Sequence, residues 1–386
     1  MARAHKPRSG SLAYYPKVRA KKHMAVFNTY PAIESEGSKP INYFGYKAGM
    51  FQVMGKNARE KSNNFGQTSA IPSTIIECPP IKIIGVRVYG KGTYGIRVLG
   101  ETTIEKPGKN LRKKITAFKV KGKKRKEEKK YSNFEELEKL KEKTLKVVLI
   151  GEVQPGMTGI GKKKADLGEL NLTGTIDEQF AFAKSKLGKE MRVNEAFADQ
   201  DFLDVKAVDK GKGFQGPVKR AGVKIQRPKA KKHRSVGSIG PWHPATVMWT
   251  VARPGQLGYQ TRTEYNRRVL TVQTNSKPIS IEGGFPNYGV IKSDYVIVTG
   301  SVPGPVKRPI ALRHAIRKAQ ASLAKYSDLN FPLEVQEEVP VKEEKKEEKE
   351  TKEEKPQKAE EKEEKKEVKE AKKEEKKENK KEVEKK

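Results

Sequence analysis

The stretch IIECPPIKIIGVRVYG, residues 75–90, decides the fold class. It holds two runs rich in β-branched residues, separated by Pro79 and Pro80, and the second run alternates towards a Tyr-Gly pair. β-branched residues bounded by Gly and Pro are typical of strands. The text from Ile41 to about Gly100 has the same character, so we expect a mainly β protein.

The block over residues 101–200 differs from the strand-rich text on either side. Its Lys-rich loops surround two helices expected behind the capping boxes Ser132…Glu135 and Thr175…Glu178. This pattern predicts an α/β insertion in the β core. Further strands are expected over 146–151, 202–208, 268–272 and 294–300.

The end of the chain predicts two more segments. A basic helix is expected from Pro309 to about Tyr326, within a C-terminal segment over 306–330. The segment after it, 331–386, is expected to be a disordered tail, because residues 341–386 contain 19 Lys and 18 Glu and no aromatic side chain. Such a composition cannot bury a core, although Glu–Lys pairs could support a transient helix.

The net charge of the chain is the strongest evidence in the sequence about function. The 386 residues hold 82 Lys or Arg against 48 Asp or Glu, a net charge of +34. This length suggests two or three domains. An excess of this size requires an anionic partner, and nucleic acid fits because each neutralised phosphate releases counterions. An acidic membrane surface fits less well, because the basic residues lie in Gly- and Pro-rich text that cannot form an amphipathic helix.

The positive charge gathers in two segments without acidic residues. The first 33 residues contain none, and we expect residues 1–40 to form an extended basic arm. Residues 210–263 also contain none, yet they hold 12 Lys or Arg, ten of them within 210–234. So many unpaired cations cannot pack into a core. We therefore expect residues 210–263 to be a basic finger that extends from the β core over 41–100 and 201–305.

Two glycine-rich motifs resemble phosphate-binding loops but lack their partners. Residues 211–216 fit G-x-G-x-x-G, but Pro217 and a basic run follow in place of the helix and acidic residue that a dinucleotide site needs. A turn that brings backbone close to RNA phosphate is the better interpretation. Gly156…Gly161-Lys162 continues with Lys163 where a Walker loop needs Ser or Thr.

The sequence offers no metal, cofactor or catalytic site. Cys78 is the single cysteine, which excludes an intrachain disulfide and a zinc site of thiolates. His233 and His243 have no nearby carboxylate to orient them for base catalysis. We expect no enzyme activity, no cofactor, no small-molecule substrate, and, without a signal peptide or an 18-residue apolar run, no membrane association and a cytosolic protein.

Both tryptophans of the chain lie in the finger, in the text GPWHPATVMWT. Trp249 lies in the apolar run 246–251 and is expected to anchor a small core. Trp242, between glycines and prolines, is expected at a loop tip, where an aromatic ring can stack on an RNA base.

Several segments together resemble the universal large-subunit ribosomal protein three family, in its archaeal form. The similarity covers residues 1–320 and rests on the order and spacing of the motifs. The matching motifs are Ser9-Gly10-Ser11-Leu12, Pro16-Lys17, Gly45-Tyr46-Lys47-Ala48-Gly49-Met50, Asp204-Val205, Lys210 to Gly216, Trp242-His243-Pro244-Ala245, Trp249 to Arg253, and Gly300 to Pro305.

The resemblance implies a translation-protein-type β-barrel with an inserted α/β domain, an extended N-terminal arm and a long internal basic finger. It implies a structural protein of the cytoplasmic ribosome that binds large-subunit rRNA near its 3′ end and nucleates subunit assembly. The finger, with Trp242 at its tip, would reach towards the peptidyl transferase centre. Contacts with ribosomal proteins fourteen and twenty-four-e are also implied. The Lys/Glu tail has no counterpart in the family, and the finger is shorter than in eukaryotic members.

The residues expected to contact RNA are basic or aromatic and lie mainly on the arm and the finger. They are Arg3, Lys6, Arg8, Lys17, Arg19, Lys21, Lys22, Lys47, Lys210, Lys212, Phe214, Lys219, Arg220, Lys224, Arg227, Lys229, Lys231, Lys232, His233, Arg234, Trp242, His243, Arg253 and Arg262.

Two other functions remain compatible with the charge. An RNA-modifying enzyme on an OB-like or Rossmann scaffold would need a convergent acid–base or metal cluster, and a turnover assay would reveal it. A chromatin-type binder of duplex DNA has similar electrostatics, and competition between duplex DNA and structured rRNA at fixed salt would separate it from an rRNA binder.

Overall fold

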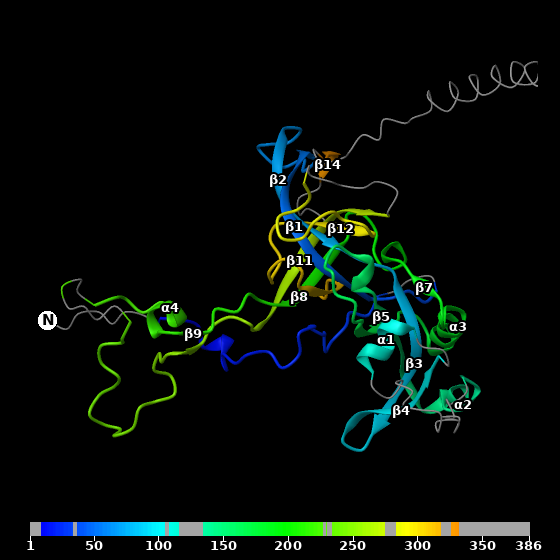
Figure 1. Cartoon of the computed structure of the whole chain (residues 1–386), viewed down its shortest axis with the longest axis horizontal. Coiled ribbons are helices and arrows are strands. Elements are labelled where there is room, and N and C mark those ends of the chain that lie inside the picture. Colours follow the sequence, from blue (N-terminus) through cyan, green and yellow to red (C-terminus); the bar gives the residue numbers. More distant parts are fainter. Residues whose placement is uncertain are drawn as a thin grey trace, which may run out of the picture. The chain divides into compact units, whose positions relative to one another are not determined.

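The structure is a computed structural model, shown in Figure 1. It describes residues 9–33, 37–104, 108–115, 134–226, 229, 234–274, 283–317 and 326–331. All of them belong to one unit, residues 1–334. Apart from Phe331, the expected tail lies outside the described residues, as does Ser132 of the first expected capping box.

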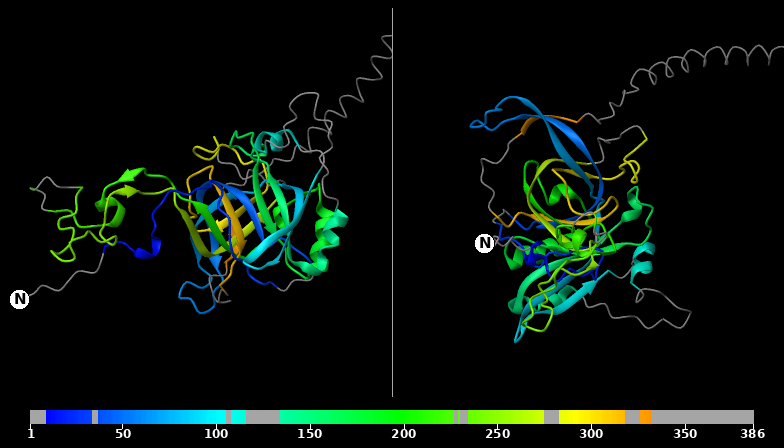
Figure 2. Two further views of the ribbon diagram at one scale, coloured as in Figure 1. Left: turned by 90° about the horizontal axis from the view of Figure 1, so that it is seen from below. Right: turned by 90° about the vertical axis from the view of Figure 1, so that its left-hand side faces the viewer.

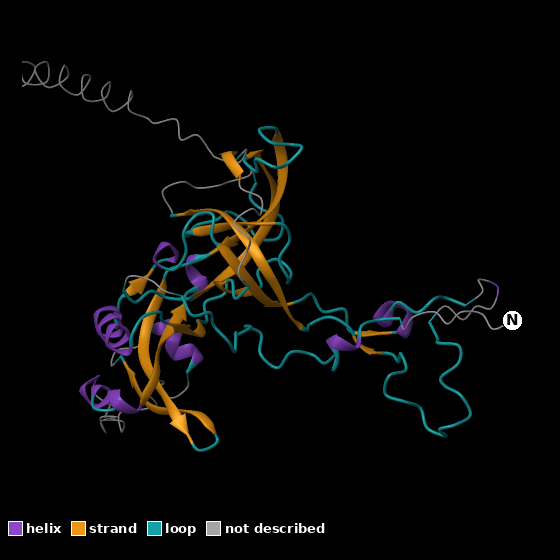
Figure 3. Cartoon of the chain, turned by 180° about the vertical axis from the view of Figure 1, so that it is seen from behind, coloured by secondary structure: helices purple, strands orange, loops and turns teal. Residues whose placement is uncertain are grey.

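Strands dominate the described chain, as expected for a mainly β protein (Figure 3). The larger sheet has the strand order β13-β8-β11-β12-β2-β1-β14. Because β1 also pairs with β13, the six strands other than β14 form a closed circuit (Figure 2). Its strands are β1 (Asn42–Asn57), β2 (Thr68–Glu77), β8 (Phe202–Val208), β11 (Thr261–Gln273), β12 (Tyr295–Thr299), β13 (Pro309–His314) and β14 (Tyr326–Asn330).

Two glycines explain how β1 packs so closely against its surroundings. A Cβ on Gly45 would lie 2.7 Å from the Cys78 sulfur, and one on Gly49 would lie 2.6 Å from the Phe285 ring. Only glycine permits such an approach without displacing the neighbour. The first eight residues of β1 are buried, which places the Gly-Tyr-Lys-Ala-Gly motif in the core.

A second sheet contains β4, β3, β5 and β6 in that order, and β7 pairs with β3. Helix α3 begins at the expected capping box, in which Thr175 and Glu178 each accept a backbone N–H of the other. The elements are β3 (Ile81–Gly92), β4 (Gly95–Thr103), α1 (Lys109–Lys114), α2 (Phe134–Glu138), η3 (Lys141–Lys143), β5 (Thr144–Val153), η4 (Pro155–Met157), β6 (Asp166–Asn171), α3 (Ile176–Lys186), β7 (Glu190–Met191) and η5 (Val193–Glu195).

The expected boundary at residue 100 is wrong. Strands β3 and β4 were expected in the β core, but they pair with each other, and β3 also pairs with β5 in the second sheet. The strands themselves were recognisable from β-branched residues and flanking prolines. Which sheet they join depends on long-range pairing that no local pattern encodes. The second sheet therefore begins at Ile81, directly after Pro79-Pro80.

The basic helix expected over 306–330 is also wrong where the structure describes the chain; residues 318–325 lie outside the described residues. Residues Pro309–His314 form β13, which lies between β1 and β8, and Tyr326–Asn330 form β14. The run Ile310-Ala311-Leu312 is fully buried, and both its backbone edges are paired. Pairing on two sides and burial on both faces outweigh a local helix propensity.

No helix in the described part of the chain is long and apolar enough to cross a bilayer.

Candidate nucleic-acid interface

The finger connects two neighbouring antiparallel strands of the larger sheet, β8 and β11. Val208 at the end of β8 pairs with Thr261 at the start of β11, so the intervening residues leave and rejoin the sheet at one place. Within this excursion, β9 (Phe214–Gln215) pairs with β10 (Gly255–Gln256), and helix α4 (Pro217–Ala221) follows β9. Figure 1 shows α4 and β9 well away from the strands of the larger sheet.

Arg220 ties the parts of the finger together and joins them to the arm. Its guanidinium donates to the carbonyl oxygens of Gln256 at 3.0 Å, Arg253 at 3.0 Å and Lys17 at 3.4 Å. The Lys17 ammonium donates in return to the carbonyl oxygen of Arg220 at 3.1 Å. Two residues that we expected to contact RNA therefore hold backbone in place.

The arm follows the finger back towards the larger sheet. Its Ala20 N–H donates to the Tyr259 carbonyl oxygen at 2.8 Å. The Tyr14 ring lies 4.8 Å from the Arg262 guanidinium, and the Tyr15 ring meets Trp249 edge-on at 6.2 Å. These contacts hold the arm against the finger, so the basic side chains of both segments lie on one continuous structure.

Three residues that the sequence did not single out secure the junction of arm, finger and sheet. The Arg308 guanidinium lies 5.2 Å from the Tyr259 ring and donates to His23 Nδ1 at 2.9 Å. Burial, followed by the charge of Arg308, lowers the pKa of His23, which favours the neutral ring that can accept this hydrogen bond. Nothing in the local sequence marks this contact, because the three residues come from distant segments.

The finger lacks the apolar packing that normally stabilises a protein segment. The hydrophobic core clusters of the described chain include no residue between Val208 and Val269. Large apolar side chains of the finger are exposed to solvent instead, and exposed apolar groups beside cations indicate a surface made for a partner. They are Phe214, Ile225, Ile239, Trp242, Val247, Met248 and Trp249.

Most of the predicted RNA contacts that the structure describes are exposed. The exposed ones are Arg19, Lys21, Lys22, Lys210, Lys212, Phe214, Lys219, Lys224, Lys229, Arg234, Trp242, His243 and Arg253. Lys17, Arg220 and Arg262 are half-buried in the contacts given above. Arg3, Lys6, Arg8, Arg227, Lys231, Lys232 and His233 lie outside the described residues.

The structure gives Lys47 a structural role in place of the predicted RNA contact. The residue is only 8% exposed, and its ammonium donates to the carbonyl oxygens of Val302 at 2.8 Å and Gly304 at 3.2 Å. Desolvation by burial lowers its pKa. Lys47 thus holds the turn before β13 against β1, where phosphate cannot reach it.

The expectation that Trp249 anchors a small core is wrong. Its side chain is 70% exposed, compared with 87% for Trp242. The apolar run around Trp249 has no second layer to pack against, because the finger has no core. The tryptophans therefore both belong to the exposed surface.

The two glycine-rich motifs that resemble phosphate-binding loops have ordinary structural roles. Residues 211–216 lead into α4, which is only five residues long. In the other motif, the Lys162 ammonium binds the Asp166 carboxylate at 2.6 Å, and Asp166 also accepts from the Tyr46 hydroxyl at 2.8 Å. In the part of the chain that the structure describes, no three His, Cys, Asp or Glu side chains are grouped as metal ligands.

Comparison with known proteins decides the family. The family model for ribosomal protein L3 matches residues 1–353. The chain belongs to the ribosomal protein L3 family. Among similar proteins, the large ribosomal subunit protein uL3 of Methanococcus vannielii is 42% identical over 320 residues, 82% of this chain and 93% of the relative.

Two other archaeal relatives of the same name agree. The Archaeoglobus fulgidus protein is 41% identical over 322 residues, covering 82% of this chain and 94% of its own. That of Methanocaldococcus jannaschii is 42% identical over 332 residues, covering 85% and 96%. Membership in the ribosomal protein L3 family confirms two expectations. The chain is a structural, non-enzymatic ribosomal protein, and it belongs to the cytoplasmic ribosome.

Proposed function

We propose that this ribosomal protein L3 family member is a primary binder of large-subunit rRNA near its 3′ end and nucleates assembly of the subunit. Its finger extends into the RNA towards the peptidyl transferase centre, with Trp242 at the tip. Ribosomal proteins fourteen and twenty-four-e are its neighbours. The closed circuit of strands acts as a translation-protein-type β-barrel, into which the second sheet and its helices are inserted.

One observation carries the RNA-binding proposal: the first 33 residues and the finger hold many exposed cations and no competing acid. Residues 210–263 contain no Asp or Glu, and exposed lysines such as Lys210, Lys212 and Lys224 lie among exposed aromatic side chains. Such a surface suits folded RNA, because phosphates bind the cations and unstacked bases stack on the aromatic rings. Hydrogen bonds of Arg220 and Lys17 present both segments as one surface.

The salt dependence of RNA binding tests this proposal. A variant with Lys210, Lys212, Lys219 and Lys224 changed to Gln should bind an rRNA fragment from the 3′ region more weakly. Because each phosphate contact contributes about 0.7–0.9 to the slope of log K against log salt, the slope should fall by about three.

A matched variant supplies the control for lost charge. Lys91, Lys109, Lys113 and Lys139 are also exposed but lie on or directly beside the second sheet and its helices. Changing these four to Gln should leave the slope almost unchanged. Equal losses of slope in both variants would show that RNA binds without preference for the finger, and the proposal would then fail.

A further inference from the structure

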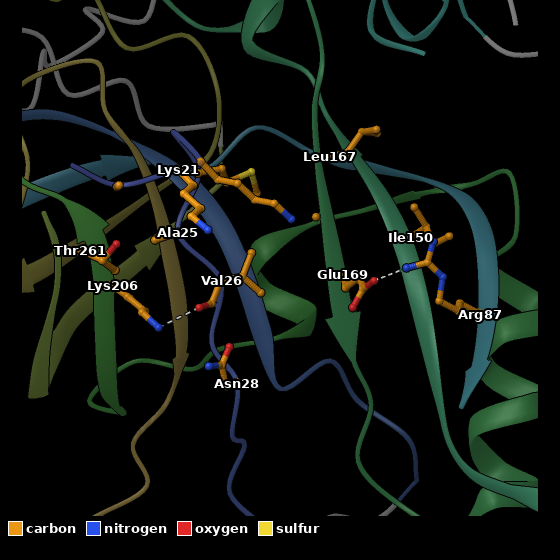
Figure 4. Close-up of a pocket in the computed structure, with 14 residues that line it drawn as sticks. Lys21, Ala25, Val26, Asn28, Arg87, Ile150, Leu167, Glu169, Lys206 and Thr261 are labelled. Atoms are coloured by element: carbon orange, nitrogen blue, oxygen red, sulfur yellow. Dashed lines mark hydrogen bonds and ion pairs between the residues drawn. The ribbon is translucent and has the colours of Figure 1, made fainter. Parts of the chain in front are cut away.

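A pocket of about 550 Å³ lies apart from the finger, where the arm passes between the two sheets (Figure 4). Arm residues 20–28 form one wall. The opposite wall consists of Arg87 on β3, Ile150 on β5 and the β6 residues Leu167 to Glu169, while Lys206 and Thr261 of the larger sheet complete the lining. The proposed contact between the finger and RNA does not involve this pocket.

The lining combines a positive field with apolar surface. Its charged side chains are Lys21, Lys22, Arg87, Lys206 and a single carboxylate, Glu169. Met24, Val26, Ile150 and Leu167 contribute apolar surface. Pockets of several hundred Å³ with apolar walls and few polar groups hold small organic groups, and the cations select an anionic one.

Hydrogen bonds along its edges fix the guanidinium of Arg87. Nε and one terminal nitrogen donate to Glu101 at 2.9 and 2.7 Å, and the other terminal nitrogen donates to Glu169. A guanidinium fixed in this way is a flat cation on whose face a nucleobase can stack.

Hydrogen-bonding capacity also remains free in the pocket. Glu169 Oε1 accepts from Arg87 and from the Tyr89 hydroxyl, whereas Oε2 has no partner among the described residues. In the same described part of the chain, the backbone N–H groups of residues 21–28 have no hydrogen-bond partner. The pocket lining thus offers one strong acceptor at Glu169, and the arm beside it has backbone N–H groups without partners.

We propose that this pocket takes one unpaired nucleotide of rRNA, flipped out of its helix. The inference rests on the proposed rRNA-binding function and adds a second, base-reading contact to it. The base lies on the Arg87 guanidinium and the apolar wall, and its phosphate lies at Lys21 and Lys22. Since Glu169 Oε2 can only accept, the base turns a donor towards it, either the amino group of adenine, cytosine or guanine or the ring N–H of guanine or uracil.

Removing the Glu169 carboxylate separates base recognition from simple charge attraction. Glu169→Ala makes the protein more positive, so non-specific attraction to RNA can only increase. Loss of the base contact should nevertheless weaken binding to the 3′-region rRNA fragment about tenfold. Glu190→Ala is the matched control: it removes an exposed carboxylate on β7 of the same sheet, which does not line the pocket. That variant should bind as tightly as the wild type or more tightly.

Mapped ultraviolet crosslinks between the full chain and this RNA locate the contact. We expect one nucleotide linked to arm residues 24–26 or to Leu167, besides crosslinks at Phe214 and Trp242. Val26→Trp, a neutral change at an exposed position, should fill the pocket and remove only the first link. Replacing the linked nucleotide by an abasic residue should weaken binding at least as much as Glu169→Ala, because the base contact is lost in both cases.

The outcomes distinguish the two proposals. If Glu169→Ala binds as tightly as Glu190→Ala while the finger crosslinks persist, the pocket inference fails and the proposed function stands. Absence of crosslinks at both places would overturn both. If guanosine monophosphate stays bound to the RNA-free protein through gel filtration, a free nucleotide is the occupant of the pocket. That result would overturn the proposal that the bound nucleotide belongs to rRNA.

Discussion

The guanidinium of Arg220 donates to the carbonyl oxygen of Lys17 at 3.4 Å, and the Lys17 ammonium donates back to the carbonyl oxygen of Arg220 at 3.1 Å. These residues are 203 positions apart in the chain. The reciprocal pair joins the arm to the finger before any RNA is bound. Preorganisation of this kind lowers the conformational entropy that binding must overcome.

Arg220→Ala should loosen the arm. The change removes hydrogen bonds to three carbonyl oxygens, which we expect to cost about 2 kcal/mol of local stability. Hydrogen exchange of the Ala20 amide, bonded to Tyr259 at 2.8 Å, should accelerate. The neighbouring Lys219→Ala removes an equal charge from an exposed side chain, and it should leave this exchange unchanged. Equal exchange in the two variants would contradict the role given to Arg220.

Asp204 and Arg313 form a buried ion pair at 2.9 Å, with side chains 0% and 4% exposed. Asp204 also accepts the backbone N–H groups of Asn266 and Ile316. Asp204→Ala should lower the free energy of unfolding by about 3–5 kcal/mol, since a cation stays buried without its partner. The double variant with Arg313→Met should lose less than the sum of the two single losses in urea denaturation. Strict additivity would show that the two side chains do not interact.

Glu77 should make stability depend on pH. Its carboxylate accepts from the Tyr288 hydroxyl and from the backbone of Lys292 and Ser293, but desolvation is the largest effect and raises its pKa above 4.5 in the folded protein. The folded state therefore holds the proton more tightly, so this contribution to stability is present below pH 4.5 and is lost as pH rises through the folded pKa.

Glu77→Gln should remove this dependence. The stability of the variant relative to the wild type should increase as pH rises above 4.5, as measured by urea denaturation across a pH series. Glu135→Gln, an exposed change on α2, provides the comparison. A relative stability of the Glu77 variant that stays constant with pH would refute the assignment.

Lys47→Met should separate folding from RNA binding. Loss of the hydrogen bonds to Val302 and Gly304 should destabilise the fold by about 1–3 kcal/mol. The salt slope of RNA binding should not change, because the ammonium is buried. A slope reduced by about one would restore Lys47 as a phosphate contact.

The two tryptophans should report RNA binding by fluorescence. Trp242 and Trp249 are 87% and 70% exposed, so the RNA-free protein should emit as indole in water does. Stacking on RNA bases should quench the emission. Trp242→Phe should abolish more of this quenching than Trp249→Phe, because the Trp249 ring already contacts Tyr15. A blue-shifted emission without RNA would contradict the exposed positions.

The sequence by itself determined the elements whose signals are local. Strand β8 spans 202–208 as expected, and α3 begins at its capping box because both hydrogen bonds join residues three apart. The acid-free runs also identified the surface of the arm and the finger, since a dense group of cations cannot be buried unpaired. These features depend on neighbours within a few positions.

Only the tertiary structure decided which strands pair and which cations are used internally. Strand β13 replaced an expected helix because β1 and β8 pair with both of its edges, and β3 joined the second sheet through β5. Lys47 and Arg220 look like other basic residues in the sequence, but carbonyl oxygens from distant segments take up their donors. Pairing and hydrogen bonding across such separations depend on the folded path of the chain, which local residue patterns do not contain.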